Sequence, residues 1–259
     1  MKKSLSVVII TRNEEENLRD CLQSVRHLAT EIVILDSNST DQTQAIAHEF
    51  GAVLKVNDDW PGFGIQKNRA LSLATGDWVL SLDADERVTP DLALEITKCL
   101  DAETDIEGYE MPRSSWYCGK FIEHSGWQPD PVLRFFKRGS AEFSDDLVHE
   151  RVLCHGKVGR LKAGLLHYSF RNFSQVLGKI DRYSSASAEQ LFLRGKTSSL
   201  GKAVGHGLWA FFRTYILRAG FLDGAQGFAL AVSSAEGTYY RYLKLWLLIN
   251  EKKPCQKQN

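Results

Sequence analysis

The residues of this sequence best suited to binding a metal ion are Asp83 and Asp85, which are separated only by Ala84. They follow residues 78–82, an apolar run that predicts a buried strand. Side chains two positions apart in an extended chain emerge on the same side, which would bring the two carboxylates together. Such pairs are common in solvated turns, but carboxylate oxygens are also the ligands that Mg²⁺ and Mn²⁺ prefer. The pair therefore predicts a divalent cation site that could bind a diphosphate.

Two other predicted strands also end in polar residues. The segment Thr11-Arg12-Asn13-Glu14 follows the apolar run 5–10, and a segment that begins with Asp36 follows the run 32–35. In an open parallel sheet, ligands bind beyond the carboxyl ends of the strands. Helix N-termini point to the same edge and supply amide donors for phosphate. These loops and the aspartate pair together predict a nucleotide site.

The elements that must position these residues alternate along the chain. The predicted strands are 5–10, 32–35, 52–56 and 78–82, and the predicted helices are 14–28, 39–50, 65–74 and 89–100. Parallel neighbours require crossover connections, so this alternation predicts a Rossmann-like, mainly parallel α/β sheet with flanking helices.

Three helix starts are predicted from capping residues. Asn13 and Ser39 each have an acidic or amide residue three positions later, which is typical of a capping box. Thr89 followed by Pro90 suits a cap and the first helical position.

Beyond residue 100 the pattern changes twice. Residues 109–168 hold short aromatic and β-branched runs, such as 132–136 and 147–153, which predict an extension of the sheet. From Asn172 onward, apolar residues recur at helical spacing through three segments that reach about Leu248. We therefore predict a catalytic domain over residues 1–170 and a helical, basic and aromatic extension over residues 171–259.

Charge is balanced in the whole chain but not along it. Residues 1–150 hold 27 acidic and 15 basic residues, whereas residues 151–259 hold 5 acidic and 17 basic residues. The overall balance argues against a nucleic-acid partner, and the asymmetry indicates two surfaces with different partners. The five cysteines show no CxxC pair, and no signal peptide or spanning segment is recognisable, so a cytoplasmic protein with reduced thiols is expected.

Several segments resemble the family 2 glycosyltransferases. The motifs that carry the resemblance are Val7 to Glu15, Leu35-Asp36-Ser37-Asn38-Ser39-Thr40-Asp41, Gln66-Lys67-Asn68-Arg69-Ala70 and Leu82-Asp83-Ala84-Asp85. Later segments, among them Leu133-Arg134-Phe135-Phe136, His149-Glu150, Leu165-Leu166-His167-Tyr168 and Ala219 to Gly224, resemble the lipopolysaccharide inner-core β-1,4-glucosyltransferase branch. The resemblance implies the GT-A fold and an inverting, metal-dependent transfer of a hexose, glucose above all, from a UDP-sugar.

The resemblance also assigns a nucleoside pocket. It implies that Thr11 and Glu14 line this pocket and that Asp36 accepts a hydrogen bond from uracil. A carboxylate there would pair with the imide N–H of uracil, which cytosine lacks at the same ring nitrogen. Arg12 stands where many relatives carry an aromatic residue, and its guanidinium plane would either stack on the base or lie in solvent.

Lys67, Asn68 and Arg69 open a predicted helix after a loop that contains Gly62 and Gly64. Their polar and positive side chains would face the diphosphate. The alternative is an ordinary amphipathic helix with its charges turned outward.

Inverting transfer needs a general base that accepts the proton of the attacking hydroxyl. The resemblance implies that Glu150 is this base, although Asp145 and Asp146 compete for the role. It also implies that His167 is a further metal ligand beside Asp85. A histidine between apolar residues can equally be a hydrogen-bonded core residue, so both interpretations of His167 stay open.

Other classes of function fit less well. A nucleotidyltransferase would need a glycine-rich loop after the first strand, and a processive synthase would need spanning helices; the sequence has neither. A non-catalytic nucleotide-binding protein would not need Asp83, Asp85 and Glu150 together.

The C-terminal segment suggests a membrane contact. Residues 196–259 hold nine Lys or Arg and three acidic residues, interleaved with aromatic residues. Such segments bind anionic lipid surfaces, so the predicted location is the inner face of the cytoplasmic membrane, with a lipid-linked oligosaccharide as the acceptor.

Overall fold

The computed structural model describes residues 3–144 and 151–251, and it divides the chain into two compact units. The first comprises Met1–Ser114 and Pro129–His167, and the second comprises Ser115–Gln128 and Tyr168–Asn259. The second unit therefore includes residues 115–128, which the sequence analysis placed in the catalytic domain.

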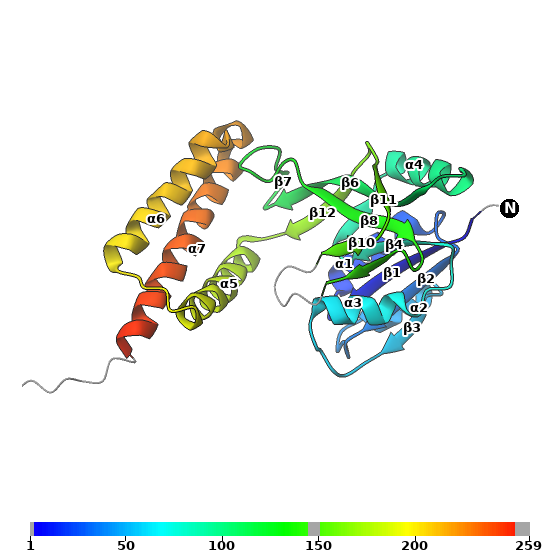
Figure 1. Cartoon of the computed structure of the whole chain (residues 1–259), viewed down its shortest axis with the longest axis horizontal. Helices are drawn as coiled ribbons and strands as arrows, with labels where there is room; N and C mark the ends of the chain where they lie inside the picture. Colours follow the sequence, from blue (N-terminus) through cyan, green and yellow to red (C-terminus); the bar gives the residue numbers. More distant parts are fainter. Residues whose placement is uncertain (1–2, 145–150, 252–259) are drawn as a thin grey trace, which may run out of the picture. The chain divides into compact units, whose positions relative to one another are not determined.

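The first unit is built on a mainly parallel sheet (Figure 1). Its parallel strands are β1 (Leu5–Thr11), β2 (Glu31–Asp36), β3 (Val53–Val56) and β4 (Trp78–Asp83), arranged in the order β3-β2-β1-β4. Two antiparallel strands, β8 (Pro131–Lys137) and β6 (Ile106–Tyr117), continue the sheet beside β4. The predicted sheet is therefore present, and the run 132–136 extends it as expected. Of the other predicted run, 147–153, residues 147–150 lie outside the described part of the chain, and residues 152 and 153 belong to a separate sheet.

Smaller strands complete the first unit. Strand β5 (Glu86–Val88) pairs antiparallel with β12 (Leu165–Phe170), and β11 (Lys157–Arg160) pairs in parallel with β6. Strands β9 (Ala141–Phe143) and β10 (Val152–Cys154) form a separate two-stranded sheet.

Helices cover both faces of the main sheet because its strands are apolar on both sides. Val7 and Ile9 of β1 lie in one core with α1 (Glu15–Val25), α2 (Thr43–Glu49) and α4 (Pro90–Asp101). Val8 and Ile10 face the other side and share a second core with α3 (Phe63–Leu71). All seven residues of β1 are buried, as expected of a central parallel strand.

Only one of the three predicted caps is confirmed. The Thr89 side chain accepts a hydrogen bond from Leu92 N–H, and Pro90 occupies the first turn of α4. The predictions for Asn13 and Ser39 are wrong, because α1 and α2 begin later, at Glu15 and Thr43. Asn13 has a positive φ of 55°, and the Ser39 hydroxyl donates to Asp36 instead.

The second unit is mostly helical. It contains the short strand β7 (Lys120–Phe121), α5 (Phe173–Leu193), α6 (Leu200–Phe212), a π-helical turn η1 (Arg213–Leu217), a 3₁₀ turn η2 (Gly220–Asp223) and α7 (Gly224–Glu251). Helix α7 packs against both α5 and α6. None of the helices in the described part of the chain is long and apolar enough to cross a membrane.

A buried carboxylate fixes the segment 115–128 to these helices. Asp223 accepts hydrogen bonds from the backbone N–H groups of Glu123 and His124, both at 3.1 Å, and from the Ser125 hydroxyl at 2.9 Å. Burial alone would raise the pKa of Asp223, but these hydrogen bonds outweigh it and lower the pKa. The carboxylate thus joins parts of the chain that are far apart in sequence.

Candidate active site

The three polar segments predicted from the sequence meet at the carboxyl edge of the parallel strands. Thr11, the last residue of β1, lies opposite Asp36, the last residue of β2. On the other side of β1, Ile10 lies opposite Asp83, the last residue of β4. The sheet register therefore places the predicted nucleoside and diphosphate residues side by side.

Asp36 is fully buried, and its carboxylate accepts four hydrogen bonds from protein donors. Oδ2 accepts from the hydroxyls of Thr11 at 2.7 Å and Ser39 at 2.6 Å. Oδ1 accepts from Ser39 N–H at 2.8 Å and from the Gln44 side-chain amide at 2.9 Å. A carboxylate has about four acceptor positions, so a bond to uracil would have to replace one of these.

Further hydrogen bonds tie the loops after β1 and β2 together. Asn13 N–H donates to the Ser39 hydroxyl at 2.8 Å, and Glu14 N–H donates to the Thr43 hydroxyl at 2.7 Å. The side chain of Arg12 is exposed on the same loop. These hydrogen bonds therefore hold the two loops together.

Glu14 carries a partly buried carboxyl group close to residues 83–85, which we call the acidic turn. Burial raises its pKa, the negative charges of Asp85 and Asp83 raise it further, and a hydrogen bond from Asn17 opposes the rise only in part. Glu14, Asp83 and Asp85 therefore lie close enough to interact electrostatically, and such a group of carboxylates would favour a bound cation.

Asp83 is held by two cations. Lys67 Nζ lies 2.7 Å from Oδ1, and a guanidinium nitrogen of Arg134 lies 2.5 Å from Oδ2. Burial would raise the pKa of Asp83, but the charges of Arg134 and Lys67 outweigh it and hold the pKa well below its ordinary value. Asp83 is therefore ionised and fixed in place.

Of the three residues predicted to face the diphosphate, only Lys67 is shown in contact with the acidic turn. The amide side chain of Asn68 bonds twice to the backbone of Phe143, which joins α3 to β9. Arg69 makes a two-pronged ion pair with Asp59, at 2.7 and 3.0 Å. Successive helical residues point about 100° apart, so three neighbours cannot share one target.

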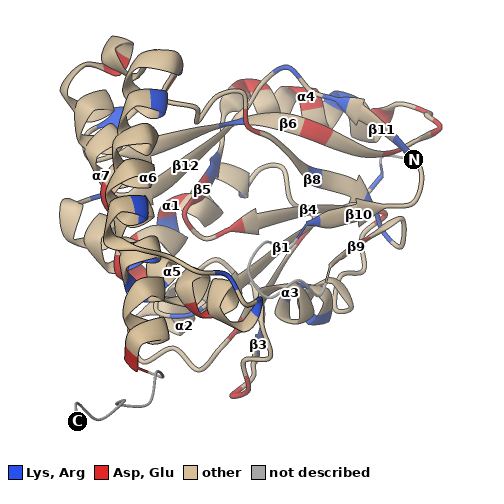
Figure 2. Ribbon diagram, turned by 60° about the vertical axis from the view of Figure 1, so that its left-hand side comes forward, with Lys and Arg blue, Asp and Glu red and all other residues tan. Residues whose placement is uncertain are grey.

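The ion-pair network continues through residues that the sequence analysis left out of the site. Arg134 also contacts Glu86 at 2.9 Å, and Glu86 contacts Arg113 at 3.3 Å. Glu86 is fully buried, and its other carboxylate oxygen accepts from Asp83 N–H at 3.0 Å. Figure 2 shows the acidic turn between β4 and β5. The sequence feature that could have predicted this network is a charged residue within an apolar strand, as Arg134 is in Leu133-Arg134-Phe135-Phe136.

Replacing Arg134 by methionine is expected to lower the free energy of unfolding at pH 7 by about 3 kcal/mol or more. The substitution keeps the apolar stem but leaves the charges of Asp83 and Glu86 partly uncompensated in a buried place. Urea unfolding of R134M and the wild type measures the loss, with R26M, at the exposed end of α1, as the control.

The same variant has an expected pH dependence. Asp83 has a lowered pKa in the folded chain, so the stability it contributes is present above its unfolded pKa of about 4 and is lost as pH falls. The difference between R134M and the wild type should therefore shrink below about pH 4. Equal unfolding midpoints at pH 7 would show that the network contributes no stability.

Asp85 and His167 come together at the same edge. His167 pairs with Glu86 in the ladder between β12 and β5, and its Nε2 lies 3.2 Å from Asp85 Oδ2. A carboxylate oxygen and an imidazole nitrogen form a donor set that suits Mn²⁺. The described residues contain no group of three or more His, Cys, Asp or Glu that could hold a metal ion, so a cation here would need donor atoms beyond these two.

The remaining predicted site residues divide into two groups. Ala84 is buried, and its carbonyl accepts from Arg87 at 2.8 Å, which shapes the turn between the two aspartates. Glu150 and its competitors Asp145 and Asp146 lie outside the described residues. The assignment of the general base therefore stays a prediction.

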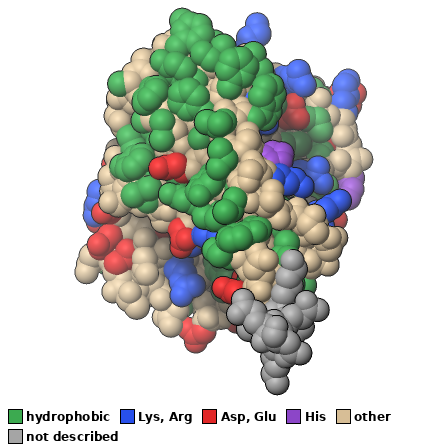
Figure 3. Space-filling model, turned by 90° about the vertical axis from the view of Figure 1, so that its left-hand side faces the viewer, with side chains coloured by type: hydrophobic (Ala, Val, Ile, Leu, Met, Phe, Trp, Pro, Cys, Tyr) green, Lys and Arg blue, Asp and Glu red, His purple; other side chains and the backbone are tan. Residues whose placement is uncertain are grey.

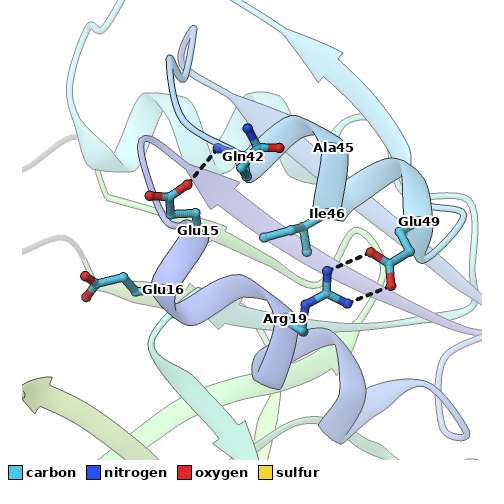
Figure 4. Close-up of a pocket in the computed structure, with 7 residues that line it drawn as sticks. All are labelled: Glu15, Glu16, Arg19, Gln42, Ala45, Ile46 and Glu49. Carbon is cyan, nitrogen blue, oxygen red and sulfur yellow. Dashed lines mark hydrogen bonds and ion pairs between the residues drawn. The ribbon is translucent and has the colours of Figure 1, made fainter.

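A surface pocket between α1 and α2 holds none of the predicted site residues (Figure 4). The Arg19 guanidinium crosses it to Glu49 at 2.6 Å, and the Glu15 carboxylate accepts from Gln42 N–H at 3.0 Å. These internal bonds engage the charged groups of Arg19, Glu49 and Glu15.

Comparisons with known proteins identify the family of this chain. The model for "Glycosyl transferase family 2" matches residues 6–156. The lipopolysaccharide core biosynthesis glycosyltransferase LpsC of Rhizobium meliloti (strain 1021) is 30% identical over 256 residues, covering 95% of this chain and 93% of LpsC. An uncharacterised glycosyltransferase of Rickettsia conorii is 29% identical, covering 95% of this chain and 90% of that protein.

Among solved structures, the mannosyltransferase PcManGT from Pyrobaculum calidifontis, in complex with GDP-Man and Mn²⁺, superimposes with a TM-score of 0.50. The two are 16% identical, and the match covers 98% of this chain and 82% of PcManGT. The fold is thus that of the GT-A enzymes, as the sequence predicted, with a helical C-terminal region. The chain belongs to glycosyl transferase family 2, whose members use nucleotide-sugar donors.

Proposed function

We propose that this enzyme transfers glucose, with inversion, from UDP-glucose to a sugar of a lipopolysaccharide core. The observation that carries the proposal is the meeting of Thr11, Asp36 and the acidic turn 83–85 at one sheet edge. The likeness to LpsC over nearly the whole chain supports the class of acceptor. The resemblance to β-1,4-glucosyltransferases supports the sugar and the stereochemistry.

The loops after β1 and β2 receive the nucleoside. Thr11 and Glu14 line the pocket, and the exposed Arg12 lies against the base. Asp36 holds Thr11 and Ser39 in place through its four hydrogen bonds. Lys67 neutralises Asp83, which reduces the repulsion between this carboxylate and a diphosphate.

Asp85 and His167 would hold the divalent cation, Mn²⁺ or Mg²⁺. The cation supplies positive charge for the departing diphosphate. Asp83 is engaged by Lys67 and Arg134, so its part is to fix the turn that carries Asp85.

Glu150 is the proposed general base. It takes the proton of the acceptor hydroxyl while the hydroxyl oxygen bonds to the anomeric carbon of glucose. The bond from that carbon to the diphosphate breaks at the same time, and UDP leaves. Attack from the face opposite the leaving group converts the α-linked donor into a β-linked product.

Replacing Asp36 by asparagine is expected to weaken the binding of UDP and of CDP by similar factors of about 10. A positioning role requires this, since the amide cannot accept four hydrogen bonds and both nucleosides lose the same pocket. Calorimetric titration of both nucleotides measures the effect, with Asp58→Asn in the exposed segment after β3 as the control. A selective loss of UDP binding would instead support the direct bond from uracil to Asp36.

The proposal is tested by incubating the purified protein with UDP-glucose, UDP-galactose, UDP-N-acetylglucosamine and GDP-mannose. Acceptors are lipopolysaccharide core oligosaccharides that lack their outer sugars, with and without lipid A. Mass spectrometry is expected to show one added hexose with UDP-glucose and none with the other donors. Nuclear magnetic resonance is expected to show that the new linkage is β. Transfer from another donor, or only to acceptors of another class, would overturn the sugar or the acceptor.

The acceptor also defines where the enzyme works. A lipid-linked core sugar lies at the surface of the cytoplasmic membrane, and its lipid environment is anionic. The net charge of +12 on residues 151–259 supports peripheral attachment to that surface.

A further inference from the structure

Helix α6 differs from an ordinary surface helix in which side chains it buries. Its buried positions hold the small residues Ala203, Gly207 and Ala210. A Cβ on Gly207 would meet the Tyr239 Cβ at 3.2 Å, which shows that α6 lies close against α7. Burying small side chains leaves the large apolar ones for the opposite face.

Those large side chains point outward in a regular stripe. Leu200, Val204, Leu208, Phe212 and Ile216 recur every four residues along α6 and η1, and each is at least 44% exposed. Trp209, Leu217, Phe221 and Leu222 are likewise exposed and widen the stripe. Figure 3 shows hydrophobic side chains gathered over the C-terminal helices. We call these nine residues the α6 face.

The segment that carries the α6 face has charges of one sign. Residues 190–222 contain Arg194, Lys196, Lys202, Arg213 and Arg218, all exposed, and no Asp or Glu. An apolar surface on a segment whose only charged residues are bases complements an anionic lipid layer, in which the apolar side chains enter the hydrocarbon and the bases meet the phosphates. A face for another copy of this chain would gain nothing from this charge, because two such faces would repel each other.

We propose that the α6 face docks the enzyme on an anionic membrane by inserting its apolar side chains into the lipid, rather than by charge alone. The inference specifies the attachment that the proposed function requires, and it can be measured without any sugar. Exposed leucine and phenylalanine at the centre of the α6 face supply the apolar part, since each buried CH₂ favours the lipid by about 0.8 kcal/mol.

The test is flotation with vesicles of 70% phosphatidylethanolamine and 30% phosphatidylglycerol. The double variant Leu208→Gln and Phe212→Gln is expected to bind at least about 10-fold more weakly than the wild type. The matched control, Val53→Gln and Leu94→Gln, changes two side chains of similar exposure in the first unit and should bind within about twofold of the wild type. All four substitutions lie on the surface, and circular dichroism confirms folding.

Salt separates insertion from charge attraction. Wild-type binding should weaken at high salt but persist, because screening acts on the bases and not on the apolar contacts. No flotation of the wild type, or equal flotation of wild type and the α6-face variant, would overturn the inference. Complete loss of wild-type binding at high salt would leave only the electrostatic account.

Two further measurements distinguish membrane docking from self-association and from a catalytic defect. Sedimentation of the wild type without lipid should show a monomer, and a dimer lost in the α6-face variant would make this face a self-association surface. Transfer to a water-soluble core oligosaccharide should be equal in wild type and variant. If no transfer is seen with any acceptor while flotation follows the expected pattern, the proposed function fails and the docking face stands.

Discussion

Replacing Asp85 by asparagine is expected to reduce the rate of sugar transfer by at least about 100-fold. The substitution keeps the shape of the turn but removes the negative charge that would hold the cation beside His167. Loss of one main electrostatic stabiliser of a transition state has an effect of this size. Initial rates at saturating Mn²⁺ measure the loss.

Asp101→Asn, at the exposed end of α4, removes a carboxylate that has no part in the proposed site and should leave the rate unchanged. The wild type should stop in excess EDTA and recover when Mn²⁺ or Mg²⁺ is added. Undiminished turnover in EDTA would show that Asp85 does not act through a cation.

Replacing Glu150 by glutamine is expected to lower turnover by about 10²- to 10⁴-fold while UDP-glucose binding is retained. Glutamine has the shape of glutamate but cannot accept the proton of the acceptor hydroxyl, and general-base catalysis contributes about this factor. Rates and calorimetric binding on the same preparation separate chemistry from binding.

Glu142→Gln, an exposed position on β9, provides a control with the same chemical change. Asp145→Asn and Asp146→Asn test the competing bases. If one aspartate variant is inactive while E150Q is nearly normal, that aspartate is the general base and the assignment of Glu150 is wrong.

The parallel sheet could be predicted because the patterns that specify it lie within short stretches of sequence. Strands that are apolar on both sides, such as β1, can only be buried, and the helices between them require parallel crossovers. The order of the strand ends then places Thr11, Asp36 and Asp83 together without further knowledge.

The roles of individual side chains depended on contacts between distant segments, which the sequence does not display. Arg134 reaches Asp83 from 51 residues away, and Asn68 bonds to Phe143 from 75 residues away. Motif membership identified Lys67, Asn68 and Arg69 as a unit, whereas helix geometry sends their side chains to different partners. The Ser39 cap failed for a local reason, since α2 begins only at Thr43 and the Ser39 hydroxyl bonds to Asp36, three residues earlier.

The Asp223 carboxylate constrains the order in which parts of the second unit can fold during synthesis. Its partners Glu123, His124 and Ser125 precede it by 98 to 100 residues. At a synthesis rate of about 5–20 residues per second, these partners are synthesised roughly 5–20 s before Asp223. Segment 115–128 therefore cannot be anchored by Asp223 while the chain grows. During that interval Tyr117 and Ile122, which belong to the core of the second unit, lack the helical residues Val176 and Leu230 that complete this core.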